Sequence, residues 1–357
     1  MHQDQTPQKI LIIGPSWIGD MVMAQSLFKK IKEINPNSDI TVTAPNWSLP
    51  LLQRMPEISK AVANTFTHGE LALKKRKELG RSLIADNYDL AIVLPNSFKS
   101  ALVPYFAKIK NRRGLKGEQR YFIINQMYKD IKKTLPLMVQ RYVACAFNPL
   151  EFKISSPADL GNIPYPQLIC NSEVIPDICK KLNIEHNDHV LGICPGAEYG
   201  NAKRWPAEYY AKIAEAWIKN RGIAYIFGSN KDLPIAQKIH DFLPNQIREK
   251  CFVITGKTTL TEAVDLLGHC EIVVTNDSGL MHVTAAVGTP LIAIYGSSTT
   301  NYTPPLSSKA KTVYLNLDCR PCFKRECPLG TTDCLKQIEP SMVIKQLNET
   351  LNIELKI

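Results

Sequence analysis

The stretch that decides the fold class covers residues 9–43 and reads KILIIGPSWIGDMVMAQSLFKKIKEINPNSDITVT. Its first part, Lys9–Ile13, is a short apolar run rich in β-branched residues, which predicts a strand. Apolar residues then recur at helical spacing over residues 21–34, and residues 40–43 predict the next strand. We therefore expect a β-α-β unit of a parallel sheet at the start of the chain.

The same alternation continues along the chain. Residues 89–94 predict a further strand, and their nearly continuous apolar content suits a parallel strand buried on both faces. The segment Gly-Asn-Ile-Pro-Tyr-Pro, residues 161–166, breaks regular structure because proline lacks an amide donor and restricts the residue before it. A second series then follows, with a helix predicted at 207–219 and strands at 189–194, 223–227, 251–254, 271–275 and 290–295.

These two series predict an α/β protein with two Rossmann-like, doubly wound domains, residues 1–165 and residues 166–340, followed by a C-terminal helix within 341–357. Doubly wound folds bind ligands beyond the carboxyl ends of their strands. We therefore expect an active site in a cleft between the carboxyl ends of two parallel sheets.

The composition is that of an ordinary globular protein, since 45% of the 357 residues are apolar and 21% are charged. The formal charge of +10 favours an acidic partner: a nucleotide, a phosphorylated glycan, a nucleic acid or an anionic membrane surface. No RNA-recognition signature or helix-turn-helix pattern supports nucleic acid. We expect a cytoplasmic protein with only peripheral membrane contact, because the first residues lack a secretory signal pattern and no apolar run is long enough for a membrane span.

Two basic runs, residues 74–81 and 108–120, fall in the first half of the chain. The plain interpretation is a solvated surface. The alternative is a patch for a polyanionic acceptor or for membrane headgroups. The second run holds Lys108, Lys110, Arg112, Arg113, Lys116 and Arg120.

The loop Gly-Pro-Ser-Trp-Ile-Gly-Asp, residues 14–20, follows the first predicted strand and leads into a helix. Its spacing resembles a P-loop, but Asp20-Met21 replaces the Lys-Ser/Thr pair that binds phosphate and magnesium, so we exclude a nucleoside triphosphatase. Asp20 has two possible roles. It could stabilise the helix N-terminus through the helix dipole, or it could accept a proton from an attacking hydroxyl group.

The second domain opens with a strand followed by Pro-Gly-Ala-Glu-Tyr-Gly-Asn-Ala-Lys-Arg-Trp-Pro, residues 195–206. This loop contains Gly196 and two adjacent cations, and it precedes a predicted helix. Lys203 or Arg204 could therefore meet a diphosphate at the helix N-terminus. The alternative is that both are ordinary surface cations.

A second loop with this character is Asn-Asp-Ser-Gly-Leu-Met-His, residues 276–282, which follows another predicted strand. The free amides of this loop and the hydroxyl group of Ser278 lie at the start of an apolar helix. His282 lies four residues after Ser278, which places both near one helical face. We predict that Asp277, Ser278, Gly279 and His282 contact phosphate or sugar, although a lone histidine is more often a packed residue.

No Asp-x-Asp sequence occurs in the chain, so the usual paired-carboxylate metal clamp of sugar-nucleotide enzymes is missing and we predict no metal at the active site. Four of the ten cysteines, Cys319, Cys322, Cys327 and Cys334, lie close together in the sequence. Their spacing does not match a standard paired zinc knuckle. They could form a metal site, or they could be packed or redox-sensitive thiols.

These motifs together resemble the lipopolysaccharide heptosyltransferases of Gram-negative bacteria, glycosyltransferase family 9. The resemblance extends over nearly the whole chain. It rests on residues 14–20, 195–206 and 276–282, and on Cys-Arg-Pro-Cys at 319–322 with Cys-Pro-Leu-Gly at 327–330.

The resemblance implies a GT-B fold in which the N-terminal domain holds the acceptor and the C-terminal domain holds ADP-heptose. In such families the C-terminal helix commonly crosses back onto the first domain, which is a possible role for residues 340–351. By resemblance, Asp20 is the catalytic base and Ser16, Trp17 and Gly19 contact the acceptor. The donor-binding residues are Gly196, Lys203, Arg204, Asp277, Ser278, Gly279 and His282.

The implied reaction is an inverting, metal-independent transfer of heptose from ADP-heptose to the first heptose of the lipopolysaccharide inner core, on lipid A-Kdo2-heptose, with release of ADP. It needs no cofactor beyond the donor substrate. The acceptor lies at the inner face of the inner membrane, which would explain the excess of basic residues. Two alternatives remain: a heptosyltransferase acting at another core position, first or branching, and a noncatalytic protein that binds a sugar nucleotide or lipopolysaccharide.

Overall fold

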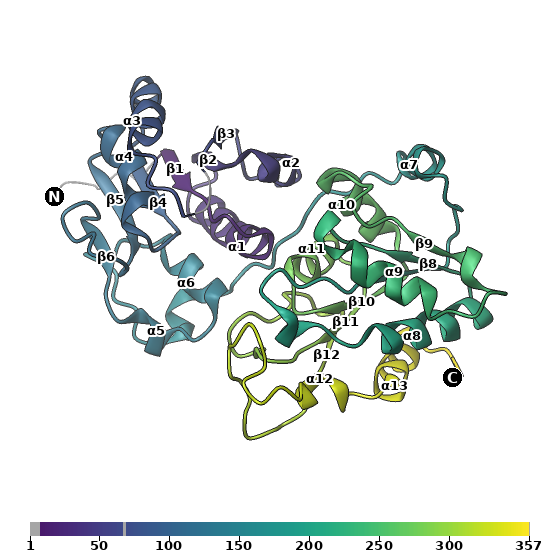
Figure 1. Ribbon diagram of the computed structural model, residues 1–357. Coiled ribbons are helices and arrows are strands. Elements are labelled where there is room, and N and C mark those ends of the chain that lie inside the picture. The colour runs from purple at the N-terminus through teal and green to yellow at the C-terminus, as the bar shows by residue number, and fades with distance from the viewer. Residues whose placement is uncertain (1–7, 67–68, 357) are drawn as a thin grey trace. The chain divides into compact units, whose positions relative to one another are not determined.

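The computed structural model describes residues 8–66 and 69–356, which form two compact units (Figure 1). The first unit ends at Pro166 and the second begins at Gln167. The break therefore falls at the end of the proline-containing segment 161–166, one residue beyond the domain boundary expected from the sequence.

The first unit is a parallel six-stranded sheet with helices between its strands, in the order β3-β2-β1-β4-β5-β6. The predicted first β-α-β unit is confirmed, with Ile12 of β1 opposite Val42 of β2. The strands are β1 Lys9–Ile13, β2 Asp39–Pro45, β3 Lys60–Asn64, β4 Leu90–Val93, β5 Asn111–Leu115 and β6 Gln126–Tyr128. The helices are α1 Ile18–Ile34, α2 Leu49–Leu52, α3 Leu73–Ser82, α4 Leu102–Phe106, α5 Ile131–Thr134 and α6 Met138–Ala144.

The second unit repeats this architecture with the sheet order β12-β11-β10-β7-β8-β9, again all parallel. The five strands predicted from the sequence are present, whereas β12 was not predicted because its short sequence, AKTV, is half exposed. The strands are β7 Val190–Cys194, β8 Ile223–Ile226, β9 Cys251–Val253, β10 Ile272–Asn276, β11 Leu291–Ile294 and β12 Ala310–Val313. The helices are α7 Ile175–Leu182, α8 Ala207–Asn220, α9 Leu233–Asp241, α10 Leu260–His269, α11 Gly279–Val287, α12 Asp333–Lys336 and α13 Pro340–Leu351.

Burial explains why the strands were recognisable in the sequence. All five residues of β7 and all five of β10 are buried, because helices cover both faces of the sheet. Two tryptophans of the second unit, Trp205 and Trp217, have fully buried side chains and belong to its main hydrophobic core. The large apolar area removed from water at these positions stabilises the scaffold behind the strand ends.

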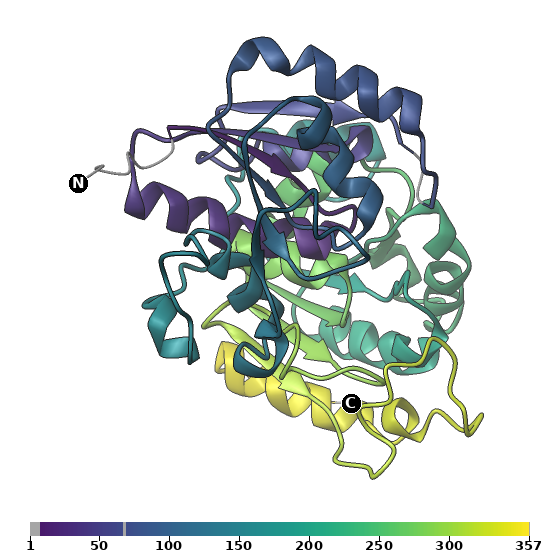
Figure 2. The same cartoon turned by 90° about the vertical axis from the view of Figure 1, so that its left-hand side faces the viewer.

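The C-terminal helix α13 packs on its own unit, where it contacts α8, β11 and β12. In Figure 2 it is the yellow helix beside the light green strands. Val343, Ile344 and Leu347 of α13 belong to the core of the second unit. The apolar face of the helix is thus covered by α8 and the sheet of its own unit. The expectation that residues 340–351 return to the N-terminal domain stays a prediction.

Each sheet reverses its strand order at one point, between β1 and β4 in the first unit and between β7 and β10 in the second. The predicted doubly wound α/β class is confirmed, and these switch points are where such folds bind ligands. Within residues 8–66 and 69–356, no helix is long and apolar enough to cross a membrane.

Candidate active site

The switch point of the second sheet brings together Lys203 and Asp277, which lie 74 residues apart in the sequence. Lys203 follows β7 and Asp277 follows β10, and Lys203 Nζ lies 2.5 Å from Asp277 Oδ2. The Asp277 side chain is only 4% exposed and the Lys203 side chain 16%. The hydroxyl group of Ser298, after β11, donates to the same carboxylate oxygen. Asp277 thus holds the ammonium group of Lys203 at the carboxyl end of the sheet.

Asn276, the last residue of β10, is fully buried and joins the two ends of the 195–206 loop. Its Oδ1 accepts a hydrogen bond from the backbone N–H of Trp205 at 3.1 Å, and its Nδ2 donates to the carbonyl oxygen of Pro195 at 2.7 Å. This clamp fixes the loop that carries Lys203. The sequence analysis placed Asn276 in a motif but did not select it as a site residue.

Helix α11 begins directly beside this ion pair. Its N-cap residue Ser278 has an extended backbone, and its side chain makes no capping hydrogen bond. The first N–H groups of α11 have no partner inside the helix, and the helix dipole gives this end a partial positive charge. Gly279 opens the helix without a side chain. Anion binding is therefore the chemistry this helix end favours.

His282 lies one turn into α11 and is only 5% exposed. Burial lowers the pKa of His282 to about 4, with Asp277 opposing the decrease and Lys203 adding to it. The imidazole is therefore neutral at physiological pH. It can donate or accept one hydrogen bond at this position, but it does not add a positive charge.

Arg204 has different partners from its neighbour Lys203. Its guanidinium group lies 3.7 Å from Asp232 Oδ1 and donates to Asn201 Oδ1 at 3.3 Å. The same Asp232 carboxylate lies under Gly196, where an added Cβ would come within 2.6 Å of it. Gly196 therefore has to be glycine so that β7 can end against Asp232.

The switch point of the first sheet carries the loop between β1 and α1. Trp17 is the N-cap of α1 and is 44% exposed, Ser16 is exposed, Gly19 is buried, and Asp20 lies half buried in the first helical turn. The structure thus places all four sequence-predicted residues of this unit at one strand end. Figure 1 shows α1 following directly from β1.

Two exposed aromatic residues at this same edge were missed by the sequence analysis. Trp47 follows β2 and is 50% exposed, and Phe98 follows β4 and is 39% exposed. Aromatic faces are suited to stacking on sugar rings. No motif marks these positions, and only their place after adjacent strands could have suggested them.

A sequence model of glycosyltransferase family 9 (heptosyltransferase) matches residues 76–332 of the chain. The chain belongs to this family. It is 47% identical to lipooligosaccharide heptosyltransferase 2 of Haemophilus influenzae, covering 96% of this chain and 99% of that protein. It is 42% identical to lipopolysaccharide heptosyltransferase 2 of Escherichia coli K12, covering 96% of this chain and 98% of that protein. This family 9 member is therefore a glycosyltransferase, and the predicted enzyme class is confirmed.

Solved structures agree with the fold. The structure of E. coli ADP-heptose LPS heptosyltransferase II superimposes on this family 9 chain with a TM-score of 0.87 at 40% identity, covering 96% of this chain and 98% of that chain. A glycosyltransferase of family 9 from Veillonella parvula shares the fold with a TM-score of 0.82 at 19% identity, covering 97% of each chain. The predicted GT-B-like α/β class is confirmed.

Two members of the second basic run, Arg113 and Arg120, differ from both of its sequence interpretations, whereas Lys108, Lys110 and Lys116 are exposed, as both interpretations expect. Arg113 and Arg120 are buried, and their guanidinium groups donate to backbone carbonyl oxygens, Arg113 to Cys145 and Ala146 and Arg120 to Pro95 and Leu115. Burial lowers the pKa of Arg120 to about 10. These arginines stabilise loops inside the first unit. They are neither solvated surface nor free to bind an anionic surface.

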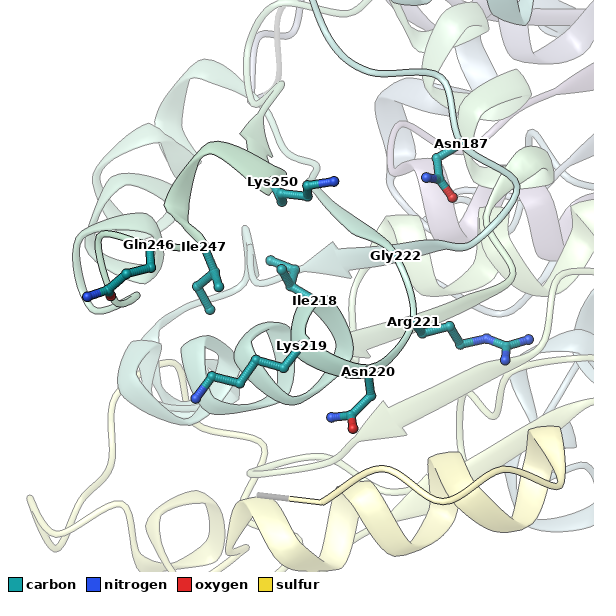
Figure 3. A pocket seen from close by; sticks show the side chains of 9 residues that line it. All are labelled: Asn187, Ile218, Lys219, Asn220, Arg221, Gly222, Gln246, Ile247 and Lys250. Atoms are coloured by element: carbon teal, nitrogen blue, oxygen red, sulfur yellow. The ribbon is translucent and has the colours of Figure 1, made fainter.

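A cavity of about 390 Å³ lies at the opposite edge of the second sheet, near the amino ends of β7 and β8 (Figure 3). Its cations are already paired: Lys219 with Glu215, Arg221 with Glu271 and Lys250 with Glu185. Family 9 chemistry is not expected here, because doubly wound folds bind ligands at the carboxyl ends of their strands. The lining residues are Asn187, Ile218, Lys219, Asn220, Arg221, Gly222, Gln246, Ile247 and Lys250.

Proposed function

We propose that this family 9 enzyme transfers a heptose from ADP-heptose to the first heptose of the lipopolysaccharide inner core and releases ADP. The observation that carries the proposal is full-length similarity, at 42% to 47% identity, to relatives named heptosyltransferase 2. The ion pair of Lys203 and Asp277 at the N-terminus of α11 supports a donor with an anionic leaving group.

The donor diphosphate is proposed to lie between Lys203 and the N-terminus of α11. As the bond from the anomeric carbon to the diphosphate oxygen breaks, negative charge accumulates on the leaving ADP. The Lys203 ammonium group and the first N–H groups of α11 stabilise that charge more in the transition state than in the ground state. Asp277, held by Ser298, keeps Lys203 in place before the donor binds.

The remaining donor contacts are proposed at Gly196, Arg204, Ser278, Gly279 and His282. A neutral His282 can hydrogen-bond to a donor hydroxyl group without competing with Lys203 for the phosphates. Gly196 is proposed to contact the donor through its backbone, because Asp232 occupies the space where a side chain would lie. The guanidinium group of Arg204 lies beside Asp232, so part of its charge is already balanced.

On the acceptor, Asp20 is proposed to remove the proton from the attacking hydroxyl group. The hydroxyl oxygen then forms a bond to the anomeric carbon on the face opposite the departing ADP, so the configuration inverts. Ser16, Trp17 and Gly19 are proposed to contact the acceptor, with Trp47 and Phe98 as additional stacking surfaces.

We also propose that the reaction requires no metal and that the enzyme acts at the inner face of the inner membrane, where it meets a lipid-linked acceptor. Nucleic acid is not a proposed partner. Sedimentation with vesicles tests the membrane contact: pelleting with anionic vesicles and not with neutral ones supports it. Equal recovery in the supernatant with both compositions contradicts it.

The acceptor and the metal requirement are tested in one experiment. ADP release from ADP-heptose is measured with a chelator present, using acceptors that end in Kdo and acceptors that already carry one heptose. Release only with the heptose-bearing acceptor is expected. Release with the Kdo-ended acceptor would assign the enzyme to the first heptose, and tight donor binding without release in either case would favour a noncatalytic binding protein.

A further inference from the structure

A pocket of about 140 Å³ in the second unit is lined by four thiols, those of Cys319, Cys322, Cys327 and Cys334. We call it the thiol pocket. Three of these cysteines lie between β12 and α12, where residues 314–332 form no helix or strand, and Cys334 lies in α12. Cys319 is exposed and the other three are partly exposed, so reagents in solution can reach them.

Cys327 differs chemically from the other cysteines. Backbone N–H groups of residues 329–332, that of Thr332 first, donate to its sulfur and lower the pKa of the thiol. Burial instead raises the pKa of Cys334. Burial also raises the pKa of thiols outside the pocket, to about 12 for Cys145 and for Cys251. Cys327 is therefore the member of the pocket best suited to react as a thiolate.

The thiol pocket is joined to the loop that carries Lys203. Ala202 lines the pocket, and its backbone N–H donates to the carbonyl oxygen of Arg325 at 3.0 Å. Asn201 Nδ2 donates to Glu326 Oε1 at 3.2 Å, immediately before Cys327. A change in the backbone of residues 325–327 would therefore move the residues directly before Lys203.

Tyr199 forms a second connection. Its hydroxyl group donates to the carbonyl oxygen of Phe323 at 2.7 Å, and its ring lies 5.1 Å from Lys203 Nζ and 5.5 Å from the Arg325 guanidinium group. Phe323 in turn donates its N–H to the carbonyl oxygen of Ser297 at 2.8 Å. The segment between Cys322 and Cys327 thus supports the 195–206 loop from one side.

We propose that the thiol pocket is a modification site for peroxide-type oxidants, in which Cys327 reacts first, a second pocket thiol closes a disulfide, and the closure displaces the 195–206 loop. The site itself is independent of the enzyme's substrate. The expected loss of ADP-heptose binding rests on the donor role proposed above for Lys203.

The chemistry balances with peroxide as the oxidant. The Cys327 thiolate attacks one peroxide oxygen, the O–O bond breaks, and the other oxygen leaves as hydroxide, which takes a proton to become water. A second thiolate then attacks the sulfenic sulfur, an S–S bond forms, and the S–O bond breaks with release of a second water. The two sulfurs are oxidised and the peroxide is reduced.

The first test is mass spectrometric mapping of the folded wild-type protein. Limited iodoacetamide labelling is expected to modify Cys327 at least about 10-fold faster than the buried Cys145 and Cys251. Limiting peroxide is expected to produce a disulfide confined to the thiol pocket, reversed by dithiothreitol. Labelling of Cys327 no faster than the buried thiols would overturn the proposal. So would a metal ion present at one per chain that blocks labelling until a chelator removes it.

The second test uses two serine variants and a binding readout. Cys327→Ser is expected to bind ADP as the untreated wild type does and to keep that affinity after peroxide treatment. Cys170→Ser, the matched control at a partly exposed thiol outside the pocket, is expected to lose affinity about 10-fold or more after peroxide, as the wild type does.

The two hypotheses fail in different ways. A pocket disulfide that leaves ADP affinity unchanged would overturn the coupling to the 195–206 loop. An untreated protein that does not bind ADP would contradict the proposed donor site, while the labelling pattern and the disulfide map would still decide whether the modification site exists.

Discussion

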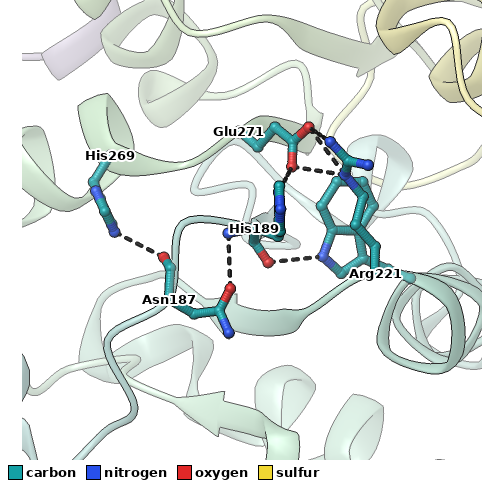
Figure 4. Close-up of polar contacts among 6 residues, drawn as sticks. Asn187, His189, Arg221, His269 and Glu271 are labelled. Atoms are coloured by element: carbon teal, nitrogen blue, oxygen red, sulfur yellow. Dashed lines mark hydrogen bonds and ion pairs between the residues drawn. The ribbon is translucent and has the colours of Figure 1, made fainter.

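The two edges of the second sheet both carry ion pairs, yet only one resembles a reaction centre. At the amino edge, Glu271 accepts hydrogen bonds from Arg221 at 2.8 and 3.0 Å, and its contact with His189 is 2.9 Å (Figure 4). At the carboxyl edge, Lys203 lies 2.5 Å from Asp277. Distance alone does not separate the two.

The difference lies in what surrounds each pair. At the amino edge, burial pushes the pKa of Glu271 upward, but hydrogen bonds from Arg221 and His189 outweigh it, and the pKa lies below its ordinary value. Glu271 is thus a well-satisfied carboxylate. At the carboxyl edge, the N-terminus of α11 adds partial positive charge to that of Lys203. Asp277 accepts hydrogen bonds from both Lys203 and Ser298. A salt bridge indicates an anion-binding site only where nearby helix dipoles add positive charge that the pair itself does not neutralise.

The largest effect is expected at Asp20, at the corresponding edge of the first sheet. Asp20→Asn keeps the shape of the side chain but removes the proton acceptor, so turnover should fall by roughly 10² to 10⁴ while donor affinity is retained. Steady-state ADP release and donor binding measure the two quantities. Near-normal turnover with reduced thermal stability would leave Asp20 only its role at the helix N-terminus.

Lys203→Ala should weaken handling of ADP-heptose by roughly 10-fold to 100-fold, because a charge-assisted contact to the diphosphate is lost. Lys203→Arg is the control, since it keeps the charge and should recover part of the loss. Both are compared in initial rates over a range of donor concentrations. If the alanine variant kept the donor kinetics of the wild type, another cation would have to bind the diphosphate.

Acid should destabilise the second unit through His282. Its pKa of about 4 in the folded protein lies below its ordinary value of 6.5, so the unfolded chain binds more protons between these pH values. The contribution of His282 to stability should therefore be complete above pH 6.5 and fall by about 3 kcal/mol toward pH 4. Denaturant unfolding of wild type and His282→Gln at both pH values tests this. An equal loss in the variant would assign the acid sensitivity to other groups.

Arg221→Ala should have the smallest effect on function. It removes the hydrogen bonds to Glu271 at the amino edge, and because Arg221 is 27% exposed the expected loss of stability is only about 1 kcal/mol. Thermal unfolding and ADP release check both parts. A large decrease in donor affinity with little change in stability would mean that the amino edge, with its cavity, binds the donor.

Much of the fold was predictable because parallel strands buried on both faces leave continuous apolar runs, as at residues 223–227 and 272–274. The half-exposed β12 has no such run. The packing of α13 depends on which apolar surface is left uncovered, and a sequence pattern does not contain that information.

The site was predictable where glycine, charge and strand ends coincide, as at Lys203 and Asp277. The residues that contact Asp277 and Gly196 could not be predicted. Ser298 and Asp232 carry no motif, and only the three-dimensional structure brings them to Asp277 and Gly196. Arg113 and Arg120 were interpreted as surface charges because composition does not reveal that backbone carbonyl groups can satisfy a buried guanidinium group.

The most direct test of the central claim is calorimetric titration of ADP into the wild type, Lys203→Ala and Arg221→Ala, at a temperature where circular dichroism shows all three folded. The account predicts that Lys203→Ala weakens ADP binding about 10-fold or more, while Arg221→Ala binds as the wild type does. The reverse pattern, with Arg221→Ala impaired and Lys203→Ala normal, would contradict the assignment of the donor site to the carboxyl edge of the second sheet.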